Sequence, residues 1–140
     1  MTKSLFGKSA LVTGGSRGIG AATVRRLATD GAAIAFTYAT SDEKAAALVA
    51  EIEADGGEAL AIRADSADPK ALQRAVTETA RRFGGLDILV NNAGILLRGP
   101  VDDFSLADFD RILAVNVRVV FVAVQTAVAH MGEGGRIMPA

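Results

Sequence analysis

The chain has 140 residues, of which 50% are apolar and 22% are charged, and its formal net charge is −1. This composition is ordinary for a soluble globular protein, and the length suits one domain with a buried core. A net charge near zero excludes a global basic field, so no nucleic-acid partner is expected. The absence of cysteine excludes disulfides and thiolate metal sites, and no metal site is expected.

Two segments bear on the location of the protein. Residues 1–15 lack the continuous apolar stretch and the small-residue cleavage site of a signal peptide. Residues 115–131 are strongly apolar, but a membrane-spanning helix needs about 20 predominantly apolar residues. Four polar side chains interrupt this segment: Asn116, Arg118, Gln125 and His130. We therefore expect no membrane partner and a cytoplasmic protein.

Short apolar runs alternate with segments of helical periodicity along the chain. Strands are expected at residues 8–13, 32–38, 58–64, 86–91 and 135–140, because turn residues bound these runs. Helices are expected at residues 18–30, 41–55 and 69–83, and residues 106–131 are expected to form one short and one long helix. This alternation predicts an α/β fold: a doubly wound, Rossmann-like parallel sheet of about five strands, incomplete, with helices on both faces.

A glycine-rich loop, TGGSRGIG at residues 13–20, follows the first expected strand and opens the first expected helix. A parallel sheet places its ligand crevice at this edge. Gly14 permits the tight turn, Gly18 leaves room for a pyrophosphate, and Gly20 lets the helix pack closely on the sheet. The helix N-terminus presents unpaired N–H groups to phosphates, and Ser16 can add a hydroxyl. The loop therefore favours a dinucleotide site over a plain strand–turn–helix connection.

The end of the second expected strand bears on which dinucleotide binds. An NAD-binding sheet usually places Asp or Glu about 20 residues after the glycine loop, on the ribose 2′-hydroxyl. Here residues 37–41 read TYATS, and no carboxylate occurs before Asp42. Arg17 can reach a 2′-phosphate, with Thr40 and Ser41 as hydroxyl donors. We therefore expect NADP(H) to be favoured over NAD(H).

The order and spacing of these motifs resemble the short-chain dehydrogenase/reductase family, most closely the 3-oxoacyl-acyl-carrier-protein reductases. TGGSRGIG is similar to the family's cofactor loop, and NNAG at residues 91–94 is similar to its second hallmark. Asn116 in AVNV matches a third hallmark, and Asp65 in RADSAD matches an aspartate that contacts adenine. The resemblance runs from about residue 8 to residue 137 and covers only the N-terminal half of the family's pattern.

The resemblance implies a role for each matched residue. Asp65 would accept a hydrogen bond from the adenine amino group, although alone it could equally cap a turn. Asn92, Ala93 and Gly94 would form a wall of small residues beside the adenosine ribose, and Asn91 would tie neighbouring strands together. The predicted cofactor-binding residues are Gly14, Ser16, Arg17, Gly18, Ile19, Gly20, Tyr38, Thr40, Ser41, Asp65, Ser66, Asn92, Ala93 and Gly94.

The resemblance also implies hydride transfer between a nicotinamide and a small carbonyl or alcohol substrate. In the family a serine, a tyrosine and a lysine four residues after the tyrosine act with an asparagine that holds a water. Asn116 is the one predicted catalytic residue that the chain matches. Tyr38 is the sole tyrosine, and Asp42 follows it at the fourth position, so it is not expected to be the catalytic tyrosine.

Pro139 does not suit a central strand, so the resemblance is expected to fail within the last three residues. We therefore expect residues 1–140 to be the dinucleotide-binding portion of a reductase truncated before its catalytic portion, with no carbonyl reductase activity of its own. Two alternatives stay open. One is a natural half-length dinucleotide-binding protein without hydride chemistry, and the other is an interaction protein that pairs through its long apolar helix.

Apolar residues lie on nearly every face of that helix, which predicts burial on two sides. The resemblance implies that the matching helix packs on the sheet and also forms much of a dimer interface. We therefore expect a homo-oligomer through the helix that contains Val117 to Val128. Its residues Val117, Val120, Phe121, Val124 and Val128 could serve either surface.

Overall fold

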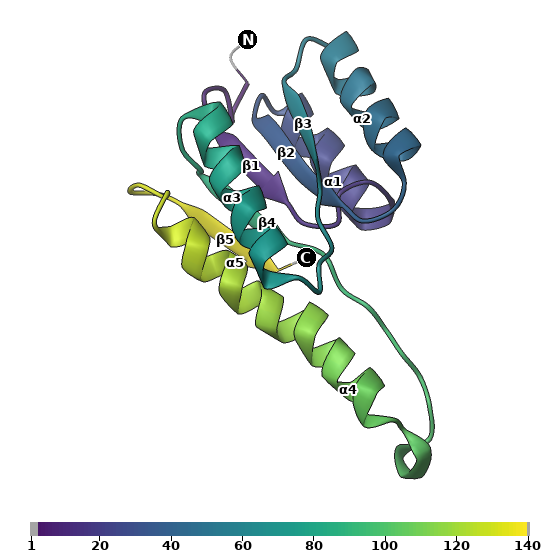
Figure 1. Cartoon of the computed structure of the whole chain (residues 1–140). Coiled ribbons are helices and arrows are strands. Elements are labelled where there is room, and N and C mark those ends of the chain that lie inside the picture. The colour runs from purple at the N-terminus through teal and green to yellow at the C-terminus, as the bar shows by residue number, and fades with distance from the viewer. Residues whose placement is uncertain (1–2, 140) are drawn as a thin grey trace.

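Residues 3–139 are described by a computed structural model (Figure 1). They contain one five-stranded sheet, in the order β3-β2-β1-β4-β5, with every pair of neighbours parallel. The strands are β1 (Ser9–Val12), β2 (Ala33–Tyr38), β3 (Ala59–Arg63), β4 (Ile88–Asn91) and β5 (Arg136–Pro139). The predicted Rossmann-like fold is confirmed. The last residue of the fifth expected strand, Ala140, lies outside the described residues.

Helices cover both faces of the sheet, and two of them begin at the predicted caps. The helices are α1 (Gly18–Thr29), α2 (Asp42–Ala54), α3 (Pro69–Phe83), α4 (Leu106–Leu113) and α5 (Val119–Val128), with a short 3-10 turn at Val101–Asp103. The Ser41 hydroxyl accepts the N–H of Lys44 at the start of α2, and the Asp68 carboxylate caps α3. These caps satisfy N–H groups that have no partner inside the helix.

The core consists of two apolar layers, one on each face of the sheet. On one face α1 and α2 contribute side chains such as Val24 and Leu48, which pack with Ile34 and Phe36. On the other face α3 and α5 pack with alternate strand residues such as Leu11. Figure 1 shows α3 and α5 side by side over this second face. Because both faces are covered, the strands are apolar throughout, as a parallel sheet requires.

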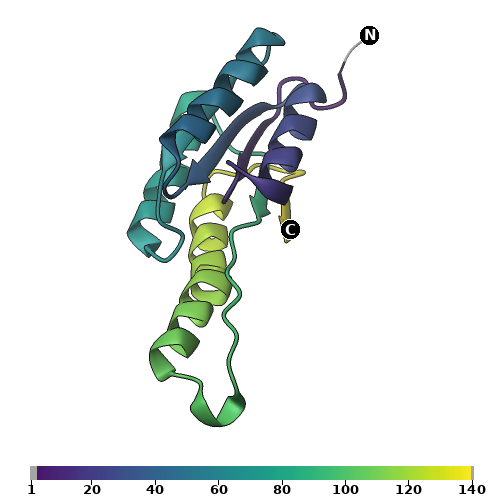
Figure 2. The ribbon, with the colours of Figure 1, turned by 90° about the vertical axis from the view of Figure 1, so that its right-hand side faces the viewer.

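The segment expected to form two helices is one continuous helix from Leu106 to Val128. No glycine or proline interrupts it, and a π-helical turn at Ala114–Arg118 joins α4 to α5. Figures 1 and 2 show α4 projecting beyond the sheet. The expected burial on two sides is wrong for the single chain: Val119 is buried, whereas Phe121 is 65% exposed. The sheet and α3 cover one side, and no described residue covers the other.

This helix is long and apolar enough to cross a membrane, by length and composition alone. The core helix of a soluble protein has the same properties, so the criterion is weak evidence. In this structure the buried side chains of Ala123 and Ala127 pack into the core on the second face of the sheet. Packing within the fold accounts for only part of this apolar character, because 22% of the segment is buried and Leu106, Phe109 and Phe121 are exposed.

Pro139 is accommodated in β5, and its register partner is Asn91. The backbone N–H of Arg136 points to β4, where it donates to the carbonyl of Asp87. Backbone direction alternates along a strand, so the nitrogen of Pro139 faces the free edge and no ladder hydrogen bond is lost. Pro139 thus fits β5 as an edge strand of the described residues, whereas the expectation concerned a central strand.

Candidate functional site

A cleft of about 700 Å³ lies where the carboxyl ends of β1 to β4 meet. The structure brings all of the predicted cofactor-binding residues to this one cleft: Gly14, Ser16, Arg17, Gly18, Ile19, Gly20, Tyr38, Thr40, Ser41, Asp65, Ser66, Asn92, Ala93 and Gly94. Parallel α/β sheets bind ligands at this edge. Their role in binding a cofactor stays a prediction, but their convergence agrees with one shared ligand.

Five further residues line the cleft that sequence reasoning missed: Ala39, Lys44, Ile95, Arg111 and Val115. Lys44 could have been found, because it lies in the first turn of α2, three residues after the Ser41 cap. No sequence pattern pointed to Arg111 and Val115, because they reach the cleft only through the path of the long helix.

Thr37, a fully buried threonine on β2, holds the glycine loop against the sheet. Its hydroxyl accepts the N–H of Gly14 at 2.9 Å, and its carbonyl accepts the N–H of Gly15 at 2.9 Å. The loop is thus positioned by a side chain that no cofactor motif identifies. A threonine inside a strand reads as an ordinary β-branched residue, so the sequence offered no signal.

Thr13 and Asn92 connect the glycine loop to the loop after β4. The buried Thr13 hydroxyl accepts the N–H groups of Asn92 and Ala93, both at 3.1 Å. The Asn92 side chain donates to the carbonyl of Gly14 at 2.9 Å. The tie expected at Asn91 is therefore made by Asn92, whose side chain follows the strand and can reach across to β1.

Close packing occurs at Gly20, as expected, and also at Gly15, where it was not expected. A Cβ on Gly15 would lie 2.5 Å from Cβ of Phe36 on β2 and 3.0 Å from Cγ2 of Val24 on α1. At Gly20 a Cβ would instead meet the backbone oxygen of Gly14 and lie 2.5 Å from Nδ2 of Asn92. Gly15 therefore permits the helix–sheet contact, and Gly20 permits the contact between the two loops.

The end of the cleft formed by the glycine loop and the start of α1 is suited to an anion. Gly18 has φ of +57°, and a Cβ there would meet nothing within 4 Å, so its backbone is open to a ligand. Arg17, at the N-cap of α1, makes no side-chain capping hydrogen bond. The helix therefore directs its first N–H groups and its positive dipole end toward the cleft.

Cations outnumber carboxylates along the cleft. The cationic lining residues are Arg17, Lys44 and Arg111, and the one lining carboxylate is Asp65. One oxygen of Asp65 accepts the N–H of Ala67 at 2.8 Å, which is the turn-capping role considered above. The other oxygen makes no hydrogen bond among the described residues and is the group that could accept from a ligand.

Tyr38 lies on the cleft wall with its phenol against the Asp42 carboxylate. A hydrogen bond with Asp42 raises the pKa of Tyr38 above its ordinary value of 10.0; burial and the negative charge of Asp42 add to this rise, and Arg63 opposes it. A phenol with a raised pKa stays protonated at neutral pH and makes a poor proton acceptor. Tyr38 is thus fitted to line the cleft and not to act as an acid/base group.

Asn116 lies in the π-helical turn and holds the loop after β4. Its Oδ1 accepts the N–H of Ile95 at 2.9 Å, and its Nδ2 donates to the carbonyl of Ile95 at 2.9 Å. Asn116 lines an adjoining cavity of about 660 Å³, which shares Asn92, Ala93, Gly94 and Ile95 with the candidate cleft. π-helical turns are frequent at functional sites.

We expect Asn116→Ala to lower the free energy of unfolding by about 1–2 kcal/mol, because two hydrogen bonds to the Ile95 backbone are lost. Urea denaturation measures this change. Asn116→Asp keeps the acceptor for the Ile95 N–H but places a carboxylate oxygen against the Ile95 carbonyl, so it should not retain the stability of the wild type. If Asn116→Ala unfolds at the same urea concentration as the wild type, the amide does not hold the loop.

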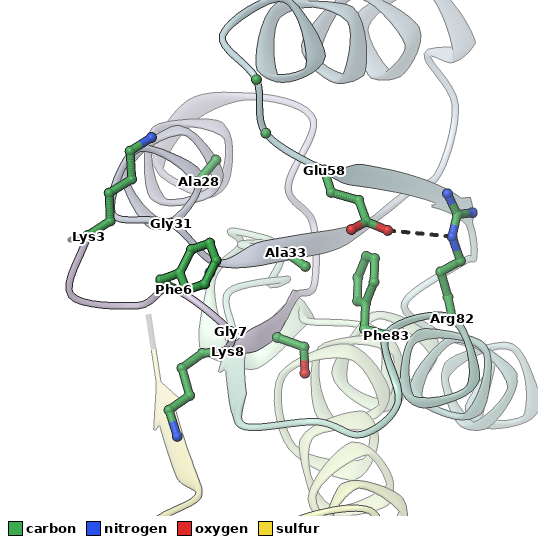
Figure 3. Close-up of a pocket in the computed structure, with 14 residues that line it drawn as sticks. Lys3, Phe6, Gly7, Lys8, Ala28, Gly31, Ala33, Glu58, Arg82 and Phe83 are labelled. Carbon is green, nitrogen blue, oxygen red and sulfur yellow. Dashed lines mark ion pairs between the residues drawn. The ribbon is translucent and has the colours of Figure 1, made fainter. Parts of the chain in front are cut away.

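Another cavity, of about 750 Å³, lies near the amino ends of β1, β2 and β3, opposite the cleft (Figure 3). The rings of Phe6 and Phe83 face it, and a Glu58–Arg82 ion pair with a 3.8 Å separation lies at its side. None of the predicted site residues lines this cavity. Within residues 3–139 no group of three or more His, Asp or Glu side chains could hold a metal ion. The candidate site is therefore the smaller cleft at the carboxyl ends of the strands.

Comparison with known proteins identifies the family. The model of the short chain dehydrogenase family matches residues 8–139, so the chain belongs to that family, as the motifs predicted. The match includes Pro139, so the expectation that the resemblance fails within the last three residues is wrong at that residue.

Relatives and solved structures agree with this assignment. Versicolorin reductase 1 of Aspergillus parasiticus is 47% identical over 96% of the chain. A short-chain dehydrogenase/reductase from Serratia marcescens has a TM-score of 0.95 at 58% identity, over 96% of this chain and 55% of its own. A short chain dehydrogenase from Burkholderia cenocepacia in complex with NADP has a TM-score of 0.94 at 62% identity, over the same shares of the two chains. The chain spans 51% of the length of versicolorin reductase 1, about half.

Proposed function

We propose that residues 1–140 form the dinucleotide-binding portion of an NADP(H)-dependent oxidoreductase of the cytoplasm. The observation that carries this proposal is the convergence of fourteen predicted residues on one cleft at the carboxyl ends of the strands. Membership in a family of dehydrogenases favours an oxidoreductase over a binding protein without hydride chemistry.

The residues present fit a dinucleotide. The N–H groups at the start of α1 would bind the pyrophosphate, with Gly18 leaving the backbone accessible. The free oxygen of Asp65 would accept from the adenine amino group. Ala93 and Gly94 leave space for the adenosine ribose, and Asn116 keeps their loop in place through Ile95.

Bound NADPH supplies a hydride, and reduction of a small carbonyl or oxidation of an alcohol is the activity that we propose for the whole protein. The chain's own contribution is to orient the dinucleotide and to shape the adjoining cavity beside Asn116. Tyr38 would remain a neutral wall residue. A tyrosine–lysine pair of the kind that the resemblance implies would have to complete the proton transfer.

The charge distribution supports NADP(H) over NAD(H). β2 ends without a carboxylate in the cleft, and Arg17 and Lys44 place two cations near Thr40 and Ser41. The 2′-phosphate of NADP(H) would therefore lie beside positive charges and hydroxyl donors. The solved relative from Burkholderia cenocepacia is a complex with NADP, which agrees with this preference.

We expect Arg17→Glu to weaken NADPH binding about 10- to 100-fold with a much smaller effect on NADH, because a carboxylate would face the 2′-phosphate. Tyr38 is the sole tyrosine and the chain has no tryptophan, so its fluorescence reports titrations inside the cleft. Arg81→Glu on α3 makes the same charge change away from the cleft and serves as the control. An unchanged ratio of NADPH to NADH affinity in Arg17→Glu would contradict the assignment.

We also propose that the chain forms a homo-oligomer through the long helix. Three of the residues named above, Val117, Phe121 and Val128, are exposed, and Leu106, Phe109 and Leu113 extend them along one side of the helix. Val120 and Val124 are only partly exposed, and Val124 packs against the core. A continuous apolar stripe on a projecting helix is typical of an interface. Sedimentation at several protein concentrations tests this, and a monomer at all of them would contradict it.

A further inference from the structure

Asp42 is the first carboxylate after β2, in the region where NAD-binding sheets place an acid, yet it does not line the cleft. Its neighbours Ser41 and Lys44 both line the cleft, and Asp42 does not. Its Oδ2 lies 3.6 Å from Nη1 of Arg63, the last residue of β3. The carboxylate is thus directed toward the edge of the sheet.

Arg63 is placed for this contact by the sheet. In the parallel register of β2 and β3, Arg63 lies beside Tyr38, the last residue of β2. Asp42 follows four residues later, in the first turn of α2. The phenol of Tyr38 interacts with the same carboxylate, and its pKa responds to Asp42 and Arg63 in opposite directions. Arg63, Asp42 and Tyr38 therefore form one cluster on the outer wall of the cleft.

We infer that Arg63 is a positioning residue for cofactor choice: it holds the Asp42 carboxylate toward β3, where it does not oppose a 2′-phosphate. This inference rests on the proposed NADP(H) function. An acidic side chain after the second strand is the feature by which NAD-binding sheets hold a ribose 2′-hydroxyl. Asp42, directly after TYATS, is such an acid. The ion pair with Arg63 keeps its carboxylate away from the cleft.

Releasing Asp42 has a predictable electrostatic effect. Without Arg63, the carboxylate gains freedom to approach the phosphate site, where like charges repel. It also gains freedom to accept a hydrogen bond from an unphosphorylated ribose. The ion pair itself is exposed, with side-chain exposures of 63% and 66%, and such pairs contribute little to stability. Variants of either residue should therefore fold.

The test is a double-mutant cycle measured by calorimetric titration with NADPH and with NADH. We expect Arg63→Ala to weaken NADPH binding about three- to tenfold, the effect of one uncompensated charge near the surface, and to leave NADH binding unchanged or tighter. Asp42→Asn in the Arg63→Ala background should restore NADPH binding, and Arg63→Lys should retain it. Arg82→Ala breaks the comparably exposed Glu58–Arg82 pair at the amino end of β3 and should leave both affinities unchanged.

The phenol of Tyr38 provides a readout that does not depend on the cofactor. Ultraviolet titration of this sole tyrosine should show a lower pKa in Asp42→Asn, because the negative charge that favours the protonated phenol is removed. Arg63→Ala should shift the pKa upward, because the opposing positive charge is lost.

Two results would contradict the role of Arg63 and leave the NADP(H) assignment standing. One is an unchanged ratio of NADPH to NADH affinity in Arg63→Ala. The other is a loss of NADPH affinity that persists fully in the double variant, which would mean that Arg63 contacts the phosphate itself. A wild-type chain that binds NADPH no more tightly than NADH would instead overturn the NADP(H) assignment, and this inference with it.

Discussion

Gly20→Ala is expected to destabilise the protein by about 1–3 kcal/mol and to abolish dinucleotide binding. In an exposed helix the same replacement usually stabilises by about 0.5–1 kcal/mol, so the sign of the change is itself informative. The reason is steric: the added Cβ would meet the backbone oxygen of Gly14 and lie 2.5 Å from Nδ2 of Asn92. Both contacts belong to the junction of the two loops, and the backbone oxygen cannot rotate away.

Urea denaturation and NADPH titration measure the two effects separately. Gly132→Ala is the matched control, because a Cβ there would meet nothing within 4 Å and its φ is not positive. It should be neutral or slightly stabilising. A Gly20→Ala variant as stable as the wild type would show that the two loops do not approach as closely as the structure indicates.

Thr13→Val is expected to lower the free energy of unfolding by about 1–3 kcal/mol and to weaken NADPH binding. The shape of the side chain is kept, but the N–H of Ala93 loses its acceptor and the N–H of Asn92 keeps only the Val90 carbonyl. The Ala93 N–H is partly buried, and an N–H that loses its acceptor there costs part of its desolvation free energy. The loop after β4 should then lose its fixed position against the glycine loop.

Thr79→Val provides a matched control for this substitution. Thr79 is fully buried, and its hydroxyl donates to the carbonyl of Ala75 within α3. That carbonyl remains bonded within the helix when the hydroxyl is removed, so the change should be close to neutral. Equal urea midpoints for Thr13→Val and the wild type would refute the role assigned to the Thr13 hydroxyl.

Local features of the sequence were enough to predict the fold class and the residues of the cleft. Apolar runs bounded by glycine mark the strands, and Ser41, Asp68 and Pro69 mark helix starts by chemistry within a few residues. In a parallel sheet every strand ends at the same edge, so motifs that follow β1, β2, β3 and β4 must meet there. For this reason the convergence of residues as distant as Gly14 and Asn92 could be predicted without coordinates.

Contacts between segments distant in sequence were not predictable in the same way. The sequence identified Gly20 as a close-packing position, but which atoms it meets depends on how the loop after β4 approaches α1. The ties made by Thr13 and Thr37 also need the final register of the strands, since a threonine in a strand carries no signal of its partner. Whether Pro139 fits β5 also depends on the position of the strand in the sheet and on which way the proline nitrogen faces.

The sequence by itself determined the elements, the parallel sheet and the loop residues that line the cofactor cleft, because these follow from periodicity, turn chemistry and motif spacing along the chain. Only the tertiary structure decided the continuity of the long helix, the cleft positions of Lys44 and Arg111, and the direction of Asp42 toward Arg63. These features depend on where side chains of separate segments meet. Contacts between separate segments depend on packing in three dimensions, and no local sequence pattern specifies them.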